Sequence, residues 1–206
     1  MRKDFSRLVL PLSFVLSELG KADTQSLLET FECDIDDDKD LEKFIHNKSI
    51  RFENATKART FLVFNKNDFL QNKNPVIYGY ITLALKILKF SNDCSKSFLK
   101  KIDGYSATKK GELITEFPGF LIGQLAKNSS IEDNPINAKM LFDLADSLII
   151  EAQRYIGGRF IMAECRDIPK LVDLYESNGF KFIGDSKDND KAMKQMLKKV
   201  PSSKQR

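Results

Sequence analysis

The sequence predicts an α/β (α+β) fold, and three observations lead to this prediction. Residues 120–183 follow the order strand, polar loop, helix, strand, helix, strand. Residues 60–64 and 76–85 are β-rich apolar runs separated by a polar turn, which is typical of a hairpin. Residues 138–156 carry apolar side chains at helical spacing. Strands that alternate with helices favour a sheet covered by helices.

The composition is that of a soluble globular protein. The chain has 206 residues, of which 42% are hydrophobic and 30% charged, and this length suits one compact domain. The three cysteines, Cys33, Cys94 and Cys165, are widely spaced and predict neither a disulfide framework nor a zinc site. They favour a reducing, cytoplasmic location. A single histidine, His46, excludes histidine-rich metal chemistry, so no metal is expected.

The net charge and the length of the apolar runs bear on whether the protein binds nucleic acid or a membrane. The net charge of +4 is too small to indicate nucleic-acid binding by itself. No apolar run approaches membrane-spanning length, so no membrane partner is expected. The N-terminus loosely resembles a signal peptide, but Asp4, Pro11 and Glu18 disfavour that interpretation. Residues 11–19 are instead predicted to form the first strand.

A single domain is expected over residues 1–200, with a disordered tail at 201–206. Residues 26–57 are predicted to be helical, interrupted by an acidic run at 34–40. That run lacks the glycine and glutamate of a calcium loop and is better explained as a helix start, where carboxylates are favourable. Residues 86–116 form a basic insertion with lysines at 86, 89, 96, 100, 101, 109 and 110. A solvated loop with a short helix at 98–102 is favoured there over a docking site for a phosphate-rich substrate.

The second half of the chain contains a candidate phosphate site. Residues 120–126 are predicted to form a strand, 127–137 a polar loop and 138–156 a helix that ends at Gly157 and Gly158. A strand at 159–165 follows. Asp167 is the predicted cap of the next helix, with Pro169 in its first turn and Gly179 at its end. Strands at 180–183 and 193–200 complete the order. Backbone amides where the loop opens the helix suit a pyrophosphate, as in many nucleotide and CoA sites.

Two stretches identify a family resemblance. FPGFLIGQLAKN (residues 117–128) and LYESNGF (residues 174–180), in this order and separation, resemble the GNAT superfamily of N-acetyltransferases, nearest its toxin-like branch. FECDIDDDKDLEKFI (residues 31–45) resembles the first helical region of that branch. The resemblance covers most of residues 31–200 and is strongest over 118–180.

The resemblance implies a mixed, mostly antiparallel central sheet, splayed between its fourth and fifth strands, with helices on both faces. Acetyl-CoA is then the co-substrate: its pantetheine arm pairs with the fourth strand, and its pyrophosphate lies on the loop and helix start. No metal is needed, because positioning supplies much of the rate enhancement. The implied cofactor-binding residues are Gln124, Leu125, Ala126, Lys127, Asn128, Asn134, Ile136, Asn137, Ala138 and Lys139.

Tyr175 matches the family's general acid. Its phenol, with an ordinary pKa of about 10, is protonated at neutral pH and can donate a proton to the departing CoA thiolate. The other interpretation is a core aromatic residue beside Leu171 and Leu174. No general base is evident. Glu116, Glu164 and a water chain are alternatives, and Lys100 and Lys101 are candidate substrate contacts. Without a histidine partner, Cys165 is better explained as a small buried residue than as a nucleophile.

The loop departs from the family pattern Gln/Arg-x-x-Gly-x-Gly/Ala. Pro135 and Asn137 replace both glycines, and Glu132 and Asp133 add negative charge. Proline removes one N–H donor, whereas Asn137 is still a good helix cap. The loop therefore binds CoA by an altered path, weakly, or not at all.

The sequence thus predicts an acetyl-CoA-dependent N-acetyltransferase. A charged tRNA is an attractive acceptor because of the toxin-like resemblance and the lysine-rich insertion. Small-molecule amines and protein amines stay open, as do an antitoxin partner and a homodimer. The first alternative is a non-catalytic binding module of the same fold with a degenerate CoA loop. The second is a nucleic-acid-binding protein without acyl transfer.

Overall fold

The computed structural model of the protein describes residues 5–34, 39–71, 75–90, 96–97, 100, 108–109, 112–188 and 191–201. The chain divides into two compact units. The first comprises Met1–Ala84 and Ile122–Glu151, and the second comprises Leu85–Leu121 and Ala152–Arg206. Three elements, β3 (Gly79–Lys89), β6 (Glu116–Lys127) and α6 (Ala138–Ile156), contain residues of both units.

The main sheet has the strand order β1-β2-β3-β6-β7-β9-β8. The first unit holds the β1-β2-β3-β6 part and the second the β3-β6-β7-β9-β8 part. The pairs β1–β2, β2–β3, β7–β9 and β8–β9 are antiparallel. β6 and β7 approach each other at their starts, where Gly119 lies against the backbone of Phe160, as parallel neighbours do. This confirms the predicted mixed, mostly antiparallel sheet; the splay between the two strands stays a prediction.

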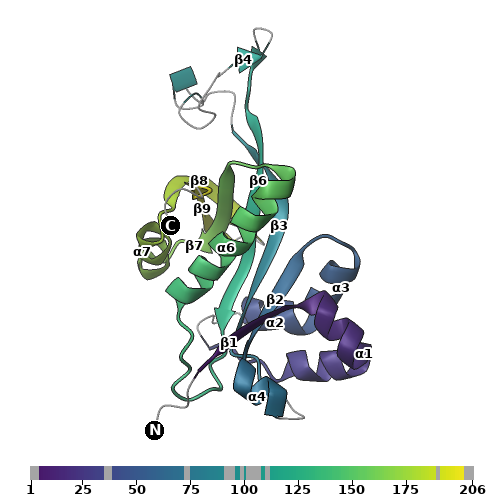
Figure 1. The fold of residues 1–206 in the computed structure, drawn as a ribbon. Coiled ribbons are helices and arrows are strands. Elements are labelled where there is room, and N and C mark those ends of the chain that lie inside the picture. The colour runs from purple at the N-terminus through teal and green to yellow at the C-terminus, as the bar shows by residue number, and fades with distance from the viewer. Residues whose placement is uncertain are drawn as a thin grey trace. The chain divides into compact units, whose positions relative to one another are not determined.

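The first unit combines this sheet with a helical layer (Figure 1). Its further elements are β1 (Arg7–Pro11), α1 (Leu12–Glu29), α2 (Asp40–Asn47), α3 (Ser49–Asn54), β2 (Arg59–Asn65) and α4 (Lys66–Gln71). Leu62 of β2 and Tyr80 of β3 belong to the core cluster that side chains of α1, α2 and α3 complete. On the other face of β3, Gly79 lies against Ile136 and Leu141, the latter on α6. Helices therefore cover both faces of this part of the sheet.

The predicted strand at residues 11–19 is wrong. β1 spans Arg7–Pro11, and the chain enters α1 at Leu12. Leu12 and Val15 are both buried, at the three-residue spacing of a helix, so a run that looked strand-like is helical. Gly20, with φ 76°, interrupts α1, a conformation that glycine adopts without steric cost.

The helical prediction for residues 26–57 is confirmed by the end of α1 and by α2 and α3. Asp40 and Glu42 lie in the first turn of α2, as expected for carboxylates at a helix start. Residues 35–38 of the acidic run lie outside the described residues.

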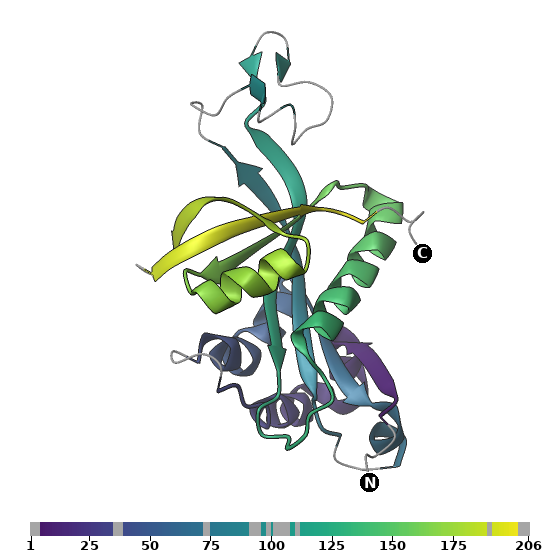
Figure 2. The same cartoon turned by 90° about the vertical axis from the view of Figure 1, so that its left-hand side faces the viewer.

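The second unit contains β7 (Phe160–Arg166), α7 (Pro169–Ser177), β8 (Lys181–Asp188) and β9 (Lys191–Lys199). β9 lies between β7 and β8, and α7 packs on β7 and β8 (Figure 2). Pro169 occupies the first turn of α7 as predicted, but the predicted cap, Asp167, is wrong. Ile168 is the cap residue, and its aliphatic side chain offers no capping bond, while Asp167 pairs with Lys194 at 3.2 Å.

Strands occupy much of the described part of the insertion at 86–116. β3 continues to Lys89, β4 (Thr108–Lys109) pairs with β5 (Glu112–Leu113), and β6 begins at Glu116. Most of the predicted helix at 98–102, and residues 202–206 of the predicted tail, lie outside the described residues. Across the residues that the structure describes, no helix is long and apolar enough to cross a membrane, and no three potential metal ligands gather.

Candidate functional site

The predicted cofactor strand, β6, is paired with β3 in the first unit, and β7 follows β6 in the strand order of the sheet. Ala126 is buried in the core, whereas Gln124, Leu125 and Lys127 are half-buried. Backbone donors and acceptors that the sheet leaves unpaired can bind an extended ligand. A pantetheine arm would need such groups at residues 124–127.

Asn128 ties the end of β6 to the rest of the first unit. Its side chain is buried and donates to the carbonyl of Ile77 at 2.8 Å. Its Oδ1 accepts from the backbone amides of Glu32 at 3.3 Å and Ser130 at 3.0 Å. Asn128 thus has its polar atoms engaged within the fold, and it shapes the loop rather than presenting a side chain to a ligand.

Asn134 holds the loop before α6 in place with its side chain. Its Nδ2 donates to the carbonyls of Tyr78 at 2.9 Å and Asn128 at 2.8 Å, and its Oδ1 accepts from the amide of Ile136 at 2.9 Å. Ile136 is itself buried. Asp133 adopts a left-handed backbone, with φ 53°. The loop is therefore built from asparagine side chains, and the Ile136 amide is used internally.

Asn137 caps α6, as the sequence predicts. Its Oδ1 accepts from the amide of Met140 at 3.0 Å. The amides of Ala138 and Lys139 lie in the first turn, where helix geometry supplies no partner within the helix. The Lys139 ammonium pairs with Asp143 at 2.9 Å. This helix start fits a phosphate with fewer amides than a glycine-rich loop would offer, and it keeps the positive end of the helix dipole.

Tyr175 lies on α7 in the second unit. It is half-buried, and its ring packs edge-on against Phe180 with the centroids 5.4 Å apart. Burial raises the pKa of the phenol, and a negative charge on Cys165 would raise this pKa further. The phenol is therefore held in its protonated form at neutral pH, which is the form that a proton donor needs.

Cys165, on β7, is buried, and that burial raises the pKa of its thiol; the Asp167 carboxylate raises this pKa further. A raised pKa lowers the thiolate fraction and hence the reactivity of a cysteine. This agrees with its interpretation as a small buried residue.

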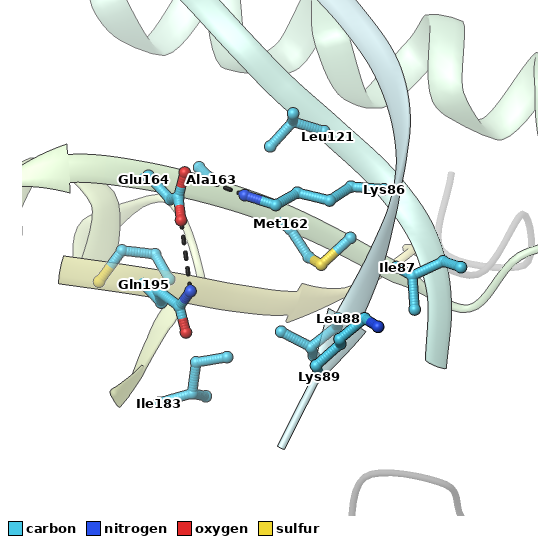
Figure 3. Close-up of a pocket in the computed structure, with 11 residues that line it drawn as sticks. Lys86, Ile87, Leu88, Lys89, Leu121, Met162, Ala163, Glu164, Ile183 and Gln195 are labelled. Carbon is cyan, nitrogen blue, oxygen red and sulfur yellow. Dashed lines mark hydrogen bonds and ion pairs between the residues drawn. The ribbon is translucent and has the colours of Figure 1, made fainter. Parts of the chain in front are cut away.

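A cavity of about 330 Å³ opens in the second unit (Figure 3). Its lining comes from β3, β6, β7, β8 and β9: Lys86, Ile87, Leu88, Lys89, Leu121, Met162, Ala163, Glu164, Ile183, Gln195 and Met196. Most of the wall is apolar, and Lys86, Glu164 and Gln195 form a polar group within it.

Glu164 is the carboxylate of this cavity. One of its oxygens lies 3.0 Å from the Lys86 ammonium, and the other accepts from the side-chain amide of Gln195 at 3.3 Å. The next residue along the strand, Cys165, lies close enough to Tyr175 to affect its pKa. Because successive side chains of a strand point to opposite faces, the cavity and Tyr175 lie on opposite faces of β7.

The other predicted substrate residues do not line this cavity. Glu116 pairs with Lys89 at 2.8 Å, and both side chains are exposed. Lys100 is exposed, and Lys101 lies outside the described residues.

Sequence reasoning missed Gln195 and the role of Lys86. Lys86 was counted only as one of the lysines of the insertion, although it lies on β3 and pairs with a residue 78 positions away. Gln195 lies opposite Glu164 in the β7–β9 register. A single sequence contains no local signal for either pairing.

The comparisons with known proteins find similarity in structure. No family model and no curated protein sequence matches it. Among solved structures, a tyrosine-to-phenylalanine mutant of KacT is 16% identical with a TM-score of 0.65, over 94% of this chain and 95% of that one. AtaTR bound with acetyl-CoA is 17% identical with a TM-score of 0.63, over 96% and 95%. AtaT complexed with acetyl-methionyl-tRNAfMet is 18% identical with a TM-score of 0.61, over 92% and 94%. KacT and AtaT are GNAT-fold toxin acetyltransferases. This chain therefore has the GNAT fold, as its sequence resemblance predicts.

Proposed function

We propose that the protein transfers an acetyl group from acetyl-CoA to a primary amine. The observation that carries the proposal is the position of Tyr175 in the second unit. Tyr175 lies on α7 beside β7 and is held in its protonated form. The GNAT fold supports the proposal, because solved structures of this fold include an acetyl-CoA complex.

Tyr175 has the role of general acid in this reaction. The acceptor nitrogen, once deprotonated by water, attacks the thioester carbonyl and forms the N–C bond. The C–S bond then breaks, and Tyr175 donates a proton to the departing CoA sulfur. Because burial raises its pKa, Tyr175 keeps this proton until the thiolate leaves.

Two backbone segments of the first unit would hold acetyl-CoA. We assign the pantetheine arm to the backbone of Gln124, Leu125, Ala126 and Lys127. We assign the pyrophosphate to the first-turn amides of Ala138 and Lys139. Asn128, Asn134, Ile136 and Asn137 then act by shaping the loop, since each of them makes hydrogen bonds within the fold.

Aminoacyl-tRNA is the acceptor that we favour. AtaT has been captured with acetyl-methionyl-tRNAfMet, and the insertion of this chain is rich in lysine. AtaT has also been captured with its antitoxin AtaR, so we propose an antitoxin partner here as well. We also propose that the protein is cytoplasmic and forms a homodimer.

Thermal unfolding with acetyl-CoA and a tyrosine variant test the activity. Acetyl-CoA at about 100 times its Kd should add about 2.7 kcal/mol of stability and raise the Tm. Tyr175→Phe should keep this shift and lose most of the turnover, whereas Tyr155→Phe, at an exposed tyrosine of α6, should leave both unchanged. A Tm that is unchanged at millimolar acetyl-CoA would favour the non-catalytic module, for which the loop without glycines is the motivating observation.

Salt dependence tests the acceptor. Phosphate contacts release counterions, so acetylation of charged tRNA should weaken steeply as salt rises. The double variant Lys96→Glu/Lys100→Glu should reduce this slope. The control variant Lys21→Glu/Lys43→Glu changes the net charge by the same amount at exposed positions of the first unit. It should leave the slope of the salt dependence unchanged. If Tyr175→Phe leaves tRNA-dependent function intact, the protein binds nucleic acid without acyl transfer.

A further inference from the structure

We infer that Lys198 is a positioning residue for Tyr175. Its ammonium holds the Phe180 ring and the turn that ends α7, and these two contacts fix where the Tyr175 phenol lies. The inference rests on the proposed function, because it names a residue that enables Tyr175 to act as the proton donor. All of these residues belong to the second unit.

Lys198 is a buried lysine on β9. The residue is only 9% exposed, and lysine is almost never buried unless its ammonium has partners. The Lys198 Nζ donates to the backbone carbonyl of Asn178 at 3.3 Å and lies 4.6 Å from the centroid of the Phe180 ring. An aromatic ring attracts a cation above its face, and the attraction grows when the cation is removed from water. The ammonium of β9 therefore binds two groups that follow α7 directly in the chain.

The turn that Lys198 holds is joined to the backbone of Tyr175. Asn178 is the C-cap residue of α7, where the carbonyl end of the helix favours a cation. The amides of Asn178 and Phe180 both donate to the Tyr175 carbonyl, at 3.0 Å and 3.2 Å. A shift of this turn would therefore move the backbone of Tyr175 with it.

The Phe180 ring extends the constraint to the phenol. The ring is buried, and it meets the Tyr175 ring at an interplanar angle of 78° with the centroids 5.4 Å apart. Edge-to-face pairs have a preferred geometry, so the orientation of one ring restricts the other. Removing the Lys198 ammonium removes a contact that orients the Phe180 ring, and the Tyr175 ring then gains freedom to turn.

The position of the phenol matters more than its presence alone. A proton donor works only when it lies within hydrogen-bond reach of the atom that receives the proton, and a displacement of about 1 Å can cost a large factor in rate. Lys198 acts on this geometry through Phe180 and Asn178, so it supports the proton donor and takes no part in the proton transfer itself.

A double-mutant cycle on acetyl transfer tests this role. Lys198→Met keeps the aliphatic stem and removes the ammonium. We expect it to lower kcat about ten-fold, a part of the roughly 10²–10⁴-fold that a proton donor contributes, with the KM for acetyl-CoA unchanged. In the Tyr175→Phe background the same change should lower kcat less than about two-fold, because no phenol is left to position. An equal loss of kcat in both backgrounds would overturn the inference, since Lys198 would then only stabilise the fold.

The next residue of β9, Lys199, provides the matched control. It is exposed, so Lys199→Met removes the same charge from the same strand without opening the protein, and it should leave kcat unchanged in both backgrounds. If Lys198→Met does not fold, Lys198→Gln takes its place in the cycle, because glutamine is uncharged and still offers a donor to the Asn178 carbonyl. Its loss of kcat should likewise depend on Tyr175, and an equal loss in both backgrounds would overturn the inference.

NMR of the full chain without acetyl-CoA tests the same geometry. We expect nuclear Overhauser cross-peaks between the ring protons of Tyr175 and Phe180, which Lys198→Met weakens and Lys199→Met leaves unchanged. Lys198→Arg should keep them, because a guanidinium also stacks on an aromatic ring. Cross-peaks that are as strong in Lys198→Met as in the wild type would overturn the inference.

The two measurements separate this inference from the proposed function. If the protein transfers no acetyl group, the proposed function fails, and the cross-peaks still decide whether Lys198 holds the phenol in place. If acetyl transfer depends on Tyr175 and is insensitive to Lys198→Met, the inference about Lys198 fails alone.

Discussion

Tyr175 combines a partly buried ring with a hydroxyl whose acidity is weakened. The sequence allowed two interpretations of Tyr175, a core aromatic residue and a general acid. The packing of its ring on Phe180 agrees with the first, and the raised pKa of its phenol keeps the proton that the second needs. A raised pKa guarantees the protonated form but makes the phenol a weaker acid than a thiol, so the proton moves only as the C–S bond breaks and negative charge develops on the sulfur. The environment thus favours late proton transfer.

This raised pKa has a consequence for stability at high pH. The folded state holds the Tyr175 proton more tightly than the unfolded state, whose phenol has its ordinary pKa of 10.0. The stabilisation is fully present below pH 10 and is lost as the pH rises above it, because only the unfolded state then releases the proton. We expect the free energy of unfolding, measured in urea, to fall more steeply above pH 10 in the wild type than in Tyr175→Phe. Identical slopes would show that the phenol is not buried in solution.

Asn128 is the polar residue on which the loop depends. Its amide group joins three segments: the start of β3 through Ile77, the chain after α1 through Glu32, and the loop through Ser130. Glu32 is 96 positions away in the sequence. Only the fold brings these partners together, so the sequence identified Asn128 as a candidate ligand contact and could not predict its internal bonds.

Replacing Asn128 with alanine should be costly. The change leaves the Ile77 carbonyl without its partner in a buried region, at about 1–3 kcal/mol, and removes the partner of the less buried Glu32 and Ser130 amides at a smaller cost. We expect Asn128→Ala to lower the urea midpoint strongly. Ser130→Ala, which loses a hydroxyl bond to Asn128, should cost only about 1 kcal/mol. Equal effects of the two variants would contradict the role assigned to Asn128.

At the scale of elements, the sequence predicted α6 best. Its bounds, Ala138–Ile156, are those predicted, because both ends are set by local chemistry: Asn137 caps the start, and Gly157 and Gly158 adopt positive φ at the end. The turn from β1 into α1 had no such signal, since an apolar run at Leu12–Val15 suits a strand and a helix alike. The apolar runs of β2 and β7 also predicted these strands to within one residue at each end, so the failure at α1 comes from an ambiguous run and not from strands in general.

The two glycines after α6 should differ in their tolerance of a side chain. Both have positive φ, 70° at Gly157 and 111° at Gly158. A Cβ at Gly157 would meet open space, whereas one at Gly158 would lie 2.5 Å from the Phe120 ring. Gly157→Ala should therefore cost only the left-handed strain of about 1–2 kcal/mol. Gly158→Ala should cost clearly more, measured as the difference in urea midpoint. A smaller loss at Gly158 would mean that the Phe120 ring moves freely.

For the whole molecule, the sequence predicted the fold and named Glu164 as a candidate, but it did not predict the cavity around Glu164. The resemblance predicted the GNAT fold, which the structural comparison confirms. The predicted cofactor residues lie in the first unit, and Tyr175 and Glu164 lie in the second. The cavity depends on Lys86, Glu164 and Gln195, which lie on three strands. Such a cavity follows from strand pairing, which a single sequence does not encode locally, so its existence could not be predicted.

The two units should unfold together, as the predicted single domain requires. The boundaries at Ala84–Leu85, Leu121–Ile122 and Glu151–Ala152 fall inside β3, β6 and α6. Unfolding one unit alone would cut these elements in the middle and leave backbone donors and acceptors unpaired at the break. We therefore expect the slowest-exchanging amides of β2, in the first unit, and of β9, in the second, to report the same free energy of opening in native-state hydrogen exchange. That value should equal the free energy of unfolding from urea. A clearly lower value for either strand would show that its unit opens by itself and that the chain is two folding units.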